Sequence, residues 1–538
     1  MKVQVCLFFL SIIFGFSHQI STPESPDYVA GVVEFTPEGY QQSSEQRTEG
    51  NMQAYMELIA SEQANEVDII VFPESTLNMR NTPTFVPHPD EMITPCEDDK
   101  YAFFLRNISC SARTHRKYVV INLTERHLCT AEEQAALNDT RECAKDGFSH
   151  YNTNVVFDRN GVVISRYRKY NLFGEAGINT TLTADKHTFT TDFNVTFGHF
   201  ICFDILFEKP ALELIRSGVR DFVYPTMWFS ELPFLTAVQV QNMWSWKQNV
   251  NFLGAGANNP TVGSTGSGIY AGKKGPLTYV MSATPMRRLL VARVPKIHLL
   301  TEPFTHDPVA VKFTEKELLN LTLKRDHLDI YTTKLVDVTL EHISEKLCFD
   351  KQCCDFHIQL KFDESLITNE TDYYRYRLGV FDGVRTYDNV ATGGVLTCGV
   401  FACATDDLDS CARRFSETDT VVPAITFESI KITGTFPSKS HVLTLPNALN
   451  SFVNPLNFKD FTYVESEERT EDGETVVDIS MELTVPHNDL RAFSIYGRNF
   501  IKDGEDVTTG GTNSVTSFGL LTFAAMSGIL LYLQQRIN

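Results

Sequence analysis

From residue 28 to about residue 300, short apolar runs alternate with longer amphipathic segments. YVAGVVEF (28–35) and VDIIVFPE (67–74) are apolar over the length of a strand, whereas residues 41–65 place apolar side chains at helical spacing. We also expect a strand at FGHFICFD (197–204), followed by a helix at LFEKPALELIRSG (206–218) that stops at Gly218. Strands that are apolar on both faces and alternate with helices are typical of sheets covered by helices. The alternation therefore predicts an α/β layered fold for this part of the chain.

The pattern changes after about residue 325. LDIYTTKLVDVTL, FHIQLKFD and ITFESIKITGTF are rich in β-branched and aromatic residues, and they often alternate apolar with polar positions. Few segments in this region have helical spacing. We expect a first domain over residues 26–305 and a mainly β, disulfide-containing second domain over residues 325–500.

The twelve cysteines divide into two even groups and a remainder. Cys6 lies in the N-terminal apolar segment. Four others lie early (Cys96, Cys110, Cys129, Cys143) and six lie late (Cys348, Cys353, Cys354, Cys398, Cys403, Cys411). Each even group can close within its own region, which leaves Cys202 unpaired, although spacing does not determine the pairs. A zinc site at CFDKQCC is disfavoured, because it lacks a matching histidine pair and an oxidising compartment favours disulfides.

Both ends of the chain carry targeting patterns. KVQVCLFFLSIIFGFS (2–17) has one basic residue and an apolar stretch too short to span a bilayer, which predicts a signal peptide over residues 1–20. Residues 501–538 form a polar linker and an apolar tail, typical of glycosylphosphatidylinositol (GPI) attachment at Gly510, Gly511 or Asn513; a transmembrane anchor is the alternative. We therefore expect a protein of the secretory pathway, held at the cell surface through a membrane anchor.

Glycosylation and charge agree with that location. Seven Asn-x-Ser/Thr sequons predict a glycoprotein: Asn107, Asn122, Asn138, Asn179, Asn194, Asn320 and Asn369. The net charge of −20 argues against nucleic acid as a partner, because phosphates would be repelled. The sequence predicts neither a cofactor nor a resident metal.

Cys202, in GHFICFDILF, has three interpretations: a core thiol, half of a disulfide, or a nucleophile. If the strand is regular, alternation of side chains turns His199 away from Cys202 and makes it a poor base. Glu74 and Lys169 end two other apolar runs. Each is unremarkable alone, as a solvated turn or a charge on an exposed edge. Together the three supply a base, an oxyanion-stabilising cation and a nucleophile, which is the chemistry of amide hydrolysis through a thioester.

The motifs VFPES, RYRKYNLFGE, ICFDILF and YPTMW, in this order, resemble the nitrilase superfamily, specifically its vanin and biotinidase branch. The second domain and the tail are also similar to vanin. The resemblance implies an α-β-β-α sandwich for the first domain. It also implies that Glu74 is the general base, Lys169 the oxyanion-stabilising lysine and Cys202 the nucleophile.

Two further residues are assigned through the resemblance. Glu175 lies where these enzymes often carry a second glutamate near the lysine, although the flanking glycines differ from the usual pattern. Trp228, with others in residues 226–235, is expected to line the substrate pocket. His199 stands where an apolar residue is usual, and a glycan at Asn194 would have to leave from a surface strand end.

The implied activity is that of an extracellular amidohydrolase acting on a small-molecule amide. The anchor-like tail favours the vanin side of the branch, and therefore cleavage of pantetheine to pantothenate and cysteamine. Hydrolysis of biotinyl amides such as biocytin is the alternative. A catalytically inactive, membrane-anchored surface glycoprotein is an alternative of another class; its mark would be a missing member of the trio, and none is missing.

Overall fold

The computed structural model describes residues 20–39, 41–297, 309–311, 313–438, 441–470 and 473–509. The predicted signal peptide lies outside these ranges except for residue 20. The apolar tail and the expected attachment residue also lie outside them, while the linker is described to residue 509. Among the described residues, no helix combines the length and apolar character that a membrane crossing needs.

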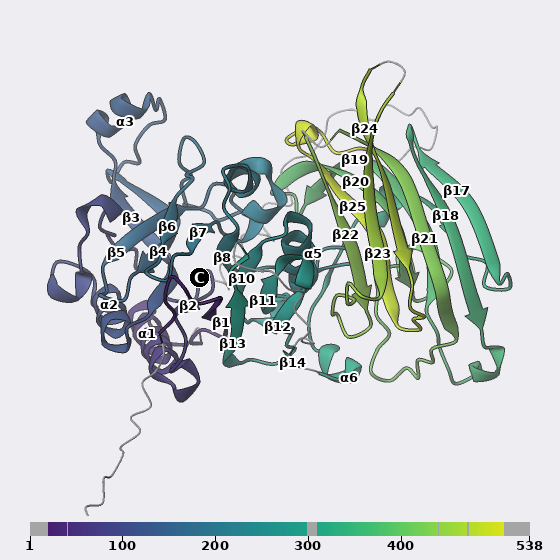
Figure 1. Ribbon diagram of the computed structural model, residues 1–538, viewed down its shortest axis with the longest axis horizontal. Coiled ribbons are helices and arrows are strands. Elements are labelled where there is room, and N and C mark those ends of the chain that lie inside the picture. The colour runs from purple at the N-terminus through teal and green to yellow at the C-terminus, as the bar shows by residue number, and fades with distance from the viewer. Residues whose placement is uncertain are drawn as a thin grey trace, which may run out of the picture.

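Two sheets form the first domain (Figure 1). The first has the order β13-β1-β2-β3-β4-β5, with bounds Arg287–Pro295, Asp27–Phe35, Ile69–Val71, Tyr118–Leu128, Phe148–Phe157 and Val163–Arg168. The second has the order β14-β12-β11-β10-β8-β7-β6, with bounds Val309–Val311, Pro276–Val280, Ser267–Ala271, Asn251–Gly256, Asp221–Thr226, Thr196–His199 and Thr188–Thr190. Because β14 pairs with β12, this sheet extends beyond the boundary expected at residue 305.

Helices cover the outer face of each sheet, as expected for an α-β-β-α sandwich. Helices α1 (Ser44–Ala60) and α2 (Phe103–His115) pack on the first sheet, and α5 (Ala237–Gln248) packs on the second. Alternation along β1 explains the layering, since Val33 faces the helices while Val32 faces the other sheet. The predicted fold class is confirmed.

One expected helix is largely absent. Residues 206–218 were expected to be helical, but only α4 (Glu213–Arg216) is regular α-helix there. Pro210 explains the difference, because a residue before proline is pushed toward extended backbone, and Lys209 has φ −107° and ψ 135°.

The second domain is a sandwich of two antiparallel sheets (green to yellow in Figure 1). One has the order β16-β19-β20-β25-β22, with bounds Thr332–Leu335, Arg375–Tyr387, Ala391–Cys403, Leu490–Asn499 and Val442–Asn450. The other has the order β17-β18-β21-β24-β23, with bounds His342–Phe349, Gln352–Phe362, Ile425–Pro437, Thr475–Leu483 and Phe461–Arg469. The mainly β character expected for this region is confirmed.

The cysteines pair within their two groups, as the even counts predicted. The disulfides are Cys96–Cys110, Cys129–Cys143, Cys348–Cys353, Cys354–Cys398 and Cys403–Cys411. The cysteines of CFDKQCC are therefore disulfide-bonded. Cys202 is the free cysteine of the described residues, and it is buried.

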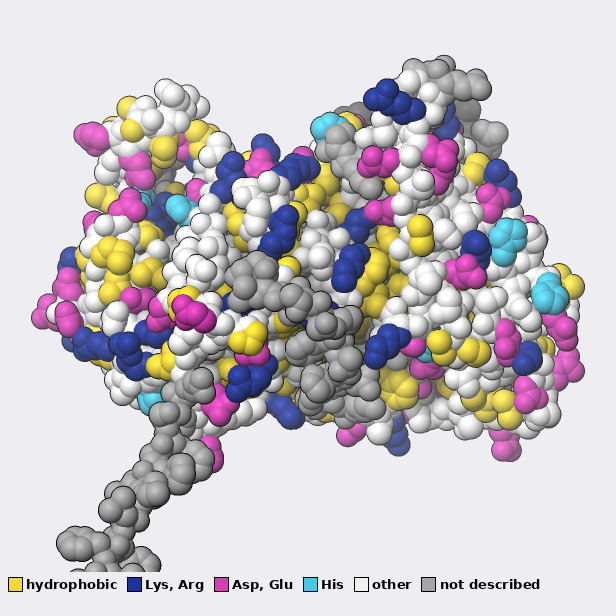
Figure 2. All heavy atoms as spheres, viewed as in Figure 1, with side chains coloured by type: hydrophobic (Ala, Val, Ile, Leu, Met, Phe, Trp, Pro, Cys, Tyr) yellow, Lys and Arg dark blue, Asp and Glu magenta, His cyan; other side chains and the backbone are white. Residues whose placement is uncertain are grey.

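The two domains share one hydrophobic core. It extends from Trp244 on α5 to Phe401 and Tyr496 in the second domain. Buried polar contacts cross the same junction: Gln239 Nε2 donates to Asn447 Oδ1 (2.6 Å). The second domain is thus packed firmly against the sheet that leads to Cys202. Acidic and basic side chains are interspersed over the face in Figure 2.

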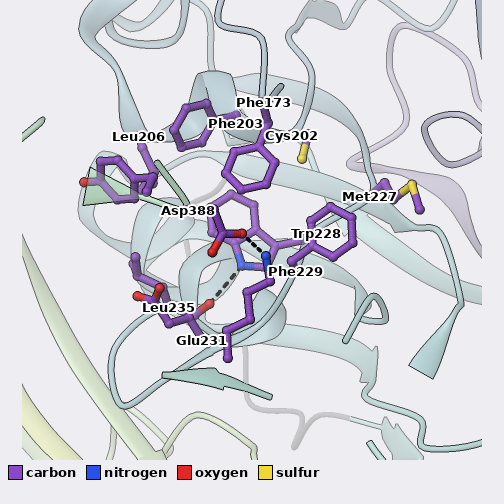
Figure 3. Close-up of a pocket in the computed structure, with 12 residues that line it drawn as sticks. Phe173, Cys202, Phe203, Leu206, Met227, Trp228, Phe229, Glu231, Leu235 and Asp388 are labelled. Carbon is purple, nitrogen blue, oxygen red and sulfur yellow. Dashed lines mark hydrogen bonds and ion pairs between the residues drawn. The ribbon is translucent and has the colours of Figure 1, made fainter. Parts of the chain in front are cut away.

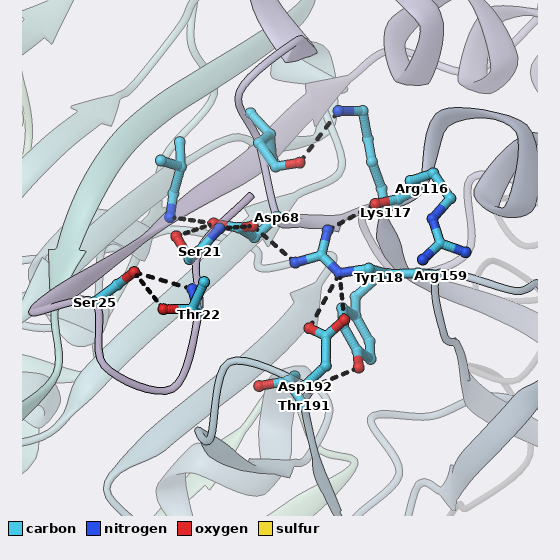
Figure 4. A network of polar contacts seen from close by, with 12 residues as sticks. Ser21, Thr22, Ser25, Asp68, Arg116, Lys117, Tyr118, Arg159, Thr191 and Asp192 are labelled. Carbon is cyan, nitrogen blue, oxygen red and sulfur yellow. Dashed lines mark hydrogen bonds and ion pairs between the residues drawn. The ribbon is translucent and has the colours of Figure 1, made fainter. Parts of the chain in front are cut away.

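An ion-pair network centred on the buried Arg159 ties the two sheets of the first domain together (Figure 4). Arg159 reaches Asp68, which precedes β2, at 2.8 Å, and Asp192, which precedes β7, at 2.9 Å. Asp68 also accepts from the Ser21 hydroxyl (2.7 Å). Asp68 lies before β2 and Asp192 before β7, whereas Glu74 and Cys202 lie after the same two strands. The network therefore joins the sheets at the end opposite to Glu74 and Cys202.

Candidate active site

The structure brings Glu74, Lys169 and Glu175 into direct contact. Glu74 follows β2, and Lys169 directly follows β5. Lys169 Nζ lies 2.8 Å from Glu74 Oε1 and 2.6 Å from Glu175 Oε1. Asn152 Nδ2, on β4, donates to the same oxygens at 2.7 Å and 3.2 Å. One ammonium group and one amide therefore hold two carboxylates together.

Charge explains the state of this cluster. Burial alone would lower the pKa of Lys169, but the carboxylates of Glu175 and Glu74 raise it well above its ordinary value. Burial would raise the pKa of Glu175, yet Lys169 holds it below its usual range. Lys169 is therefore a fixed cation at neutral pH.

Cys202 occupies a turn rather than the expected strand. Strand β7 ends at His199, and Cys202 begins a 3₁₀ turn (Cys202–Leu206) with φ +47°. A non-glycine residue at positive φ is strained and persists only where its surroundings hold it. Here Tyr224 donates its hydroxyl to the Cys202 carbonyl oxygen at 2.7 Å. The turn thus presents the thiol at a sharp bend after a strand.

Asp204 fixes this bend and links it to the lysine loop. Its carboxylate accepts from the backbone N–H of Ile201 (3.0 Å), the Tyr167 hydroxyl (2.7 Å) and the backbone N–H of Asn171 (2.8 Å). Burial raises the pKa of Asp204 to about 6, against the effect of these bonds. One carboxylate therefore joins the segment of Cys202 to the segment that begins with Lys169.

The Cys202 thiol is protonated at rest. Burial raises its pKa above the ordinary value, and the Glu74 carboxylate raises it further. Lys169 and hydrogen bonds from Thr226 and the Met227 backbone act in the opposite direction without prevailing. A reaction at this sulfur consequently needs a base that takes the proton as the bond forms.

Glu74 has the free acceptor site that a base needs. Within the described part of the chain, its Oε2 accepts one hydrogen bond, from the backbone N–H of Met227 at 2.7 Å. A carboxylate oxygen has two acceptor sites, so one remains on Oε2. Met227 also bonds to Cys202. The backbone of Met227 therefore holds the carboxylate beside the thiol.

His199 has a structural role. His199 Nε2 lies 3.0 Å from the Ser165 hydroxyl, and burial lowers the pKa of this histidine to about 3. It is neutral and engaged with Ser165 on β5. Strand alternation is not the reason, because β7 ends at His199 and Cys202 lies in the turn that follows.

The prediction of a glycan at Asn122 is wrong. This side chain is 1% exposed, and its amide donates to Asn152 and accepts from the Ser75 backbone N–H (2.7 and 2.8 Å). Asn122 thereby supports the side-chain amide of Asn152, which bridges the carboxylates of Glu74 and Glu175. Asn107 is half-buried, whereas the other sequon asparagines are exposed: Asn138, Asn179, Asn194, Asn320 and Asn369.

A largely apolar pocket opens beside Cys202 (Figure 3). It encloses about 420 Å³, including the space open to solvent. Its lining residues are Phe173, Cys202, Phe203, Leu206, Met227, Trp228, Phe229, Glu231, Leu235, Lys324, Tyr387 and Asp388. Trp228 lies in this wall, with Nε1 donating to the Leu235 carbonyl at 2.8 Å. The pocket gives an organic substrate a place next to the thiol.

Sequence reasoning missed several of these residues. Asn152 lies in a strand and had no motif to distinguish it. Tyr387 and Asp388 belong to the second domain, and Lys324 to the segment between the domains. Pocket residues so distant in sequence become visible only once the domains are packed together. No group of three or more His, Cys, Asp or Glu side chains in the described ranges is arranged to hold a metal ion.

Comparison with known proteins adds the family. Residues 39–249 match the carbon-nitrogen hydrolase family model, and residues 321–503 match the vanin C-terminal domain model. Vanin-like protein 1 of Drosophila melanogaster is 39% identical over 519 residues, covering 93% of this chain and 90% of the relative. Biotinidase of Homo sapiens is 30% identical over 410 residues (68% of this chain, 72% of the relative). Pantetheinase of Canis lupus familiaris is 30% identical over 362 residues (65% of each).

Among solved structures, an amidase from Nesterenkonia sp. AN1 is 14% identical, with a TM-score of 0.36 over 51% of this chain and 92% of that one. The assignment does not rest on this match. It rests on the two family models, which cover both domains, and on the near full-length relatives. The chain therefore belongs to the carbon-nitrogen hydrolases, in their vanin and biotinidase branch, and is a hydrolase of amide C–N bonds.

Proposed function

We propose that this protein hydrolyses pantetheine to pantothenate and cysteamine, through a thioester formed on Cys202. The observation that carries the proposal is the contact of Lys169 with both Glu74 and Glu175, beside a buried, unpaired thiol. This arrangement supplies a fixed cation, a carboxylate with a free acceptor site, and a sulfur that cannot ionise without help.

In the first half of the reaction, Glu74 takes the proton from the Cys202 thiol as the sulfur attacks the amide carbonyl carbon. The carbonyl oxygen becomes an oxyanion, which the Lys169 ammonium stabilises. Collapse of this intermediate breaks the C–N bond. The departing amine takes the proton back from the Glu74 carboxylic acid, and the acyl group remains on Cys202 as a thioester.

In the second half, water attacks the thioester carbonyl while Glu74 accepts a proton from that water. Lys169 again faces the oxyanion. The C–S bond then breaks, the carboxylic acid product leaves, and the proton on Glu74 returns to the sulfur. Glu175 takes no proton in this scheme; with Asn152 it keeps Lys169 charged and in place.

The pocket supports pantetheine over a biotinyl amide. Its walls beside Cys202 are aromatic and aliphatic, which suits the branched carbon chain of the pantoyl group, and charged side chains stand at Lys324 and Asp388. Relatives named pantetheinase and biotinidase are both 30% identical, so sequence identity does not separate the two substrates.

We propose further that the protein acts outside the cell and is tethered by its C-terminal tail. Five disulfides indicate an oxidising compartment. The tether is inferred from the composition of residues 501–538.

The test is an assay of the purified protein with pantetheine and with biocytin, following release of cysteamine and of lysine. We expect kcat/KM for pantetheine to exceed that for biocytin by at least about tenfold, the ratio that about 1.4 kcal/mol of differential transition-state binding produces. Preference for biocytin would assign the biotinidase activity instead. Cleavage of neither would favour the inactive surface glycoprotein.

A further inference from the structure

The pocket beside Cys202 is completed by the second domain. Tyr387 ends β19, and Asp388 begins the turn that leads to β20. The Tyr387 ring packs edge-on against Phe203, the residue after Cys202, and the two ring centroids are 5.4 Å apart. Val390, in the same turn, packs against Gly174, the residue before Glu175. A Cβ atom on Gly174 would lie 3.0 Å from the Val390 side chain. This turn therefore contacts both the Cys202 segment and the Glu175 loop.

The turn is held rigidly. Asp388 and Asn389 both have positive φ (50° and 58°), the geometry of a tight hairpin turn. Nearby, Arg385 is 1% exposed, and its guanidinium donates to both Glu231 oxygens at 2.6 and 2.8 Å. Arg385 also lies 3.0 Å from Asp326. These contacts hold the backbone of the hairpin, and with it the backbone of Asp388, at the pocket.

Asp388, labelled in Figure 3, forms an ion pair with Lys324, and both side chains line the pocket. The Lys324 ammonium also stands over the rings of Phe229 and Phe173, at 4.9 and 5.5 Å from their centroids. The two side chains are 32% and 38% exposed, so a ligand can reach both of them. A partly exposed ion pair contributes little stability, and its members can turn toward a new partner at small cost.

The charges around this pair select the kind of group that binds. Lys324 offers donors and Asp388 offers acceptors side by side, which matches a hydroxyl that both donates and accepts. A carboxylate on the ligand would be repelled by Asp388 and by the nearby Glu231 and Asp326. Arg385 would not offset this repulsion, because it is already paired with Glu231 and Asp326. The pocket is therefore suited to a neutral hydrogen-bonding group.

We propose that Lys324 and Asp388 bind the neutral, hydroxyl-bearing end of the acyl chain and so determine substrate specificity. The proposal rests on amide hydrolysis at Cys202. It makes the hairpin of the second domain part of the substrate site. It also gives the packed domain junction a function. The acyl chain can bind the hairpin and react at Cys202 only if the distance between the hairpin and Cys202 stays constant.

The test compares two amides with the same leaving group: pantetheine, and N-propionylcysteamine, which lacks the hydroxylated end. Release of cysteamine reports on both. We expect Lys324→Met and Asp388→Ala each to lower the ratio of kcat/KM for pantetheine to that for N-propionylcysteamine by about tenfold or more, mainly through KM, as loss of a charged hydrogen bond does. Lys316→Met, at an exposed lysine of α6 (Glu315–Leu318), is the matched control and should leave the ratio unchanged.

The inference is overturned if either variant lowers both substrates equally, or if the ratio stays within about twofold of wild type, a difference smaller than one charged hydrogen bond produces. Failure of the proposed function is a separate result. In that case the wild-type protein itself would cleave neither amide, or would cleave N-propionylcysteamine and not pantetheine.

Discussion

Cys202→Ala is expected to lower kcat for amide hydrolysis by roughly 10⁴-fold or more, the scale of losses when a covalent nucleophile is removed. Without the sulfur no thioester forms, and direct attack of water would have to replace two easier steps by one difficult step. Substrate binding should survive, because the aromatic walls of the pocket are unchanged. The measurements are kcat with pantetheine in excess, and pantetheine affinity by calorimetry.

The control for this variant is its fold. Cys202 is buried but small, so alanine leaves only a small cavity, and the melting temperature should change by a few degrees at most. Cys202→Ser, which keeps a weaker nucleophile in nearly the same volume, should also be close to inactive. A variant that folds and keeps about a tenth or more of wild-type kcat would contradict covalent catalysis at this residue.

Lys169→Met is expected to lower kcat by about 10²-fold or more, because the cation that stabilises the oxyanion is lost. It should also destabilise the protein by about 3–5 kcal/mol, since Glu74 and Glu175 would share a buried site without a counter-charge. The measurements are steady-state kinetics and denaturant unfolding. The two effects have separate causes, and a second variant distinguishes them.

That second variant is Lys169→Met combined with Glu175→Gln. It leaves one buried carboxylate in place of two, so it should recover part of the lost stability, while kcat should stay as low as in Lys169→Met. Recovery of activity together with stability would mean that Lys169 acts only by holding the two carboxylates together. Wild-type kcat in Lys169→Met itself would remove the lysine from the reaction.

The sequence predicts much of the fold because its patterns are local. Alternating apolar runs indicated the layered sheets, and even cysteine counts indicated that the early and late disulfides close separately and leave Cys202 free. Where a local signal was misread, a competing one explains it. Residues 206–218 were expected to form a helix that stops at Gly218, but Pro210 breaks the segment. Asn122 has a sequon, but a sequon carries no information about burial, and this asparagine is 1% exposed.

The candidate site was only partly predictable for the same reason. Glu74, Lys169 and Cys202 each end or follow an apolar run and could be named from motifs. Asn152 could not, since its role depends on the carboxylates of Glu74 and Glu175, which come from other parts of the chain and lie beside it only in the folded domain. Asp388 lies far along the chain in another domain, and its approach to Cys202 follows from packing across the junction. Tertiary contacts of this kind leave no local pattern.

The thioester on Cys202 can be detected by mass spectrometry of the protein quenched with acid during turnover of pantetheine. We expect a fraction of the protein to carry one pantothenoyl group. Hydroxylamine should remove this group, as it removes a thioester, and proteolysis should map it to the peptide with Cys202. Glu74→Gln should form little of this adduct, because the thiol keeps its proton. A pantothenoyl group on another residue would contradict covalent catalysis at Cys202. So would efficient turnover by the wild-type protein without any adduct, under conditions in which hydrolysis of the thioester limits the rate.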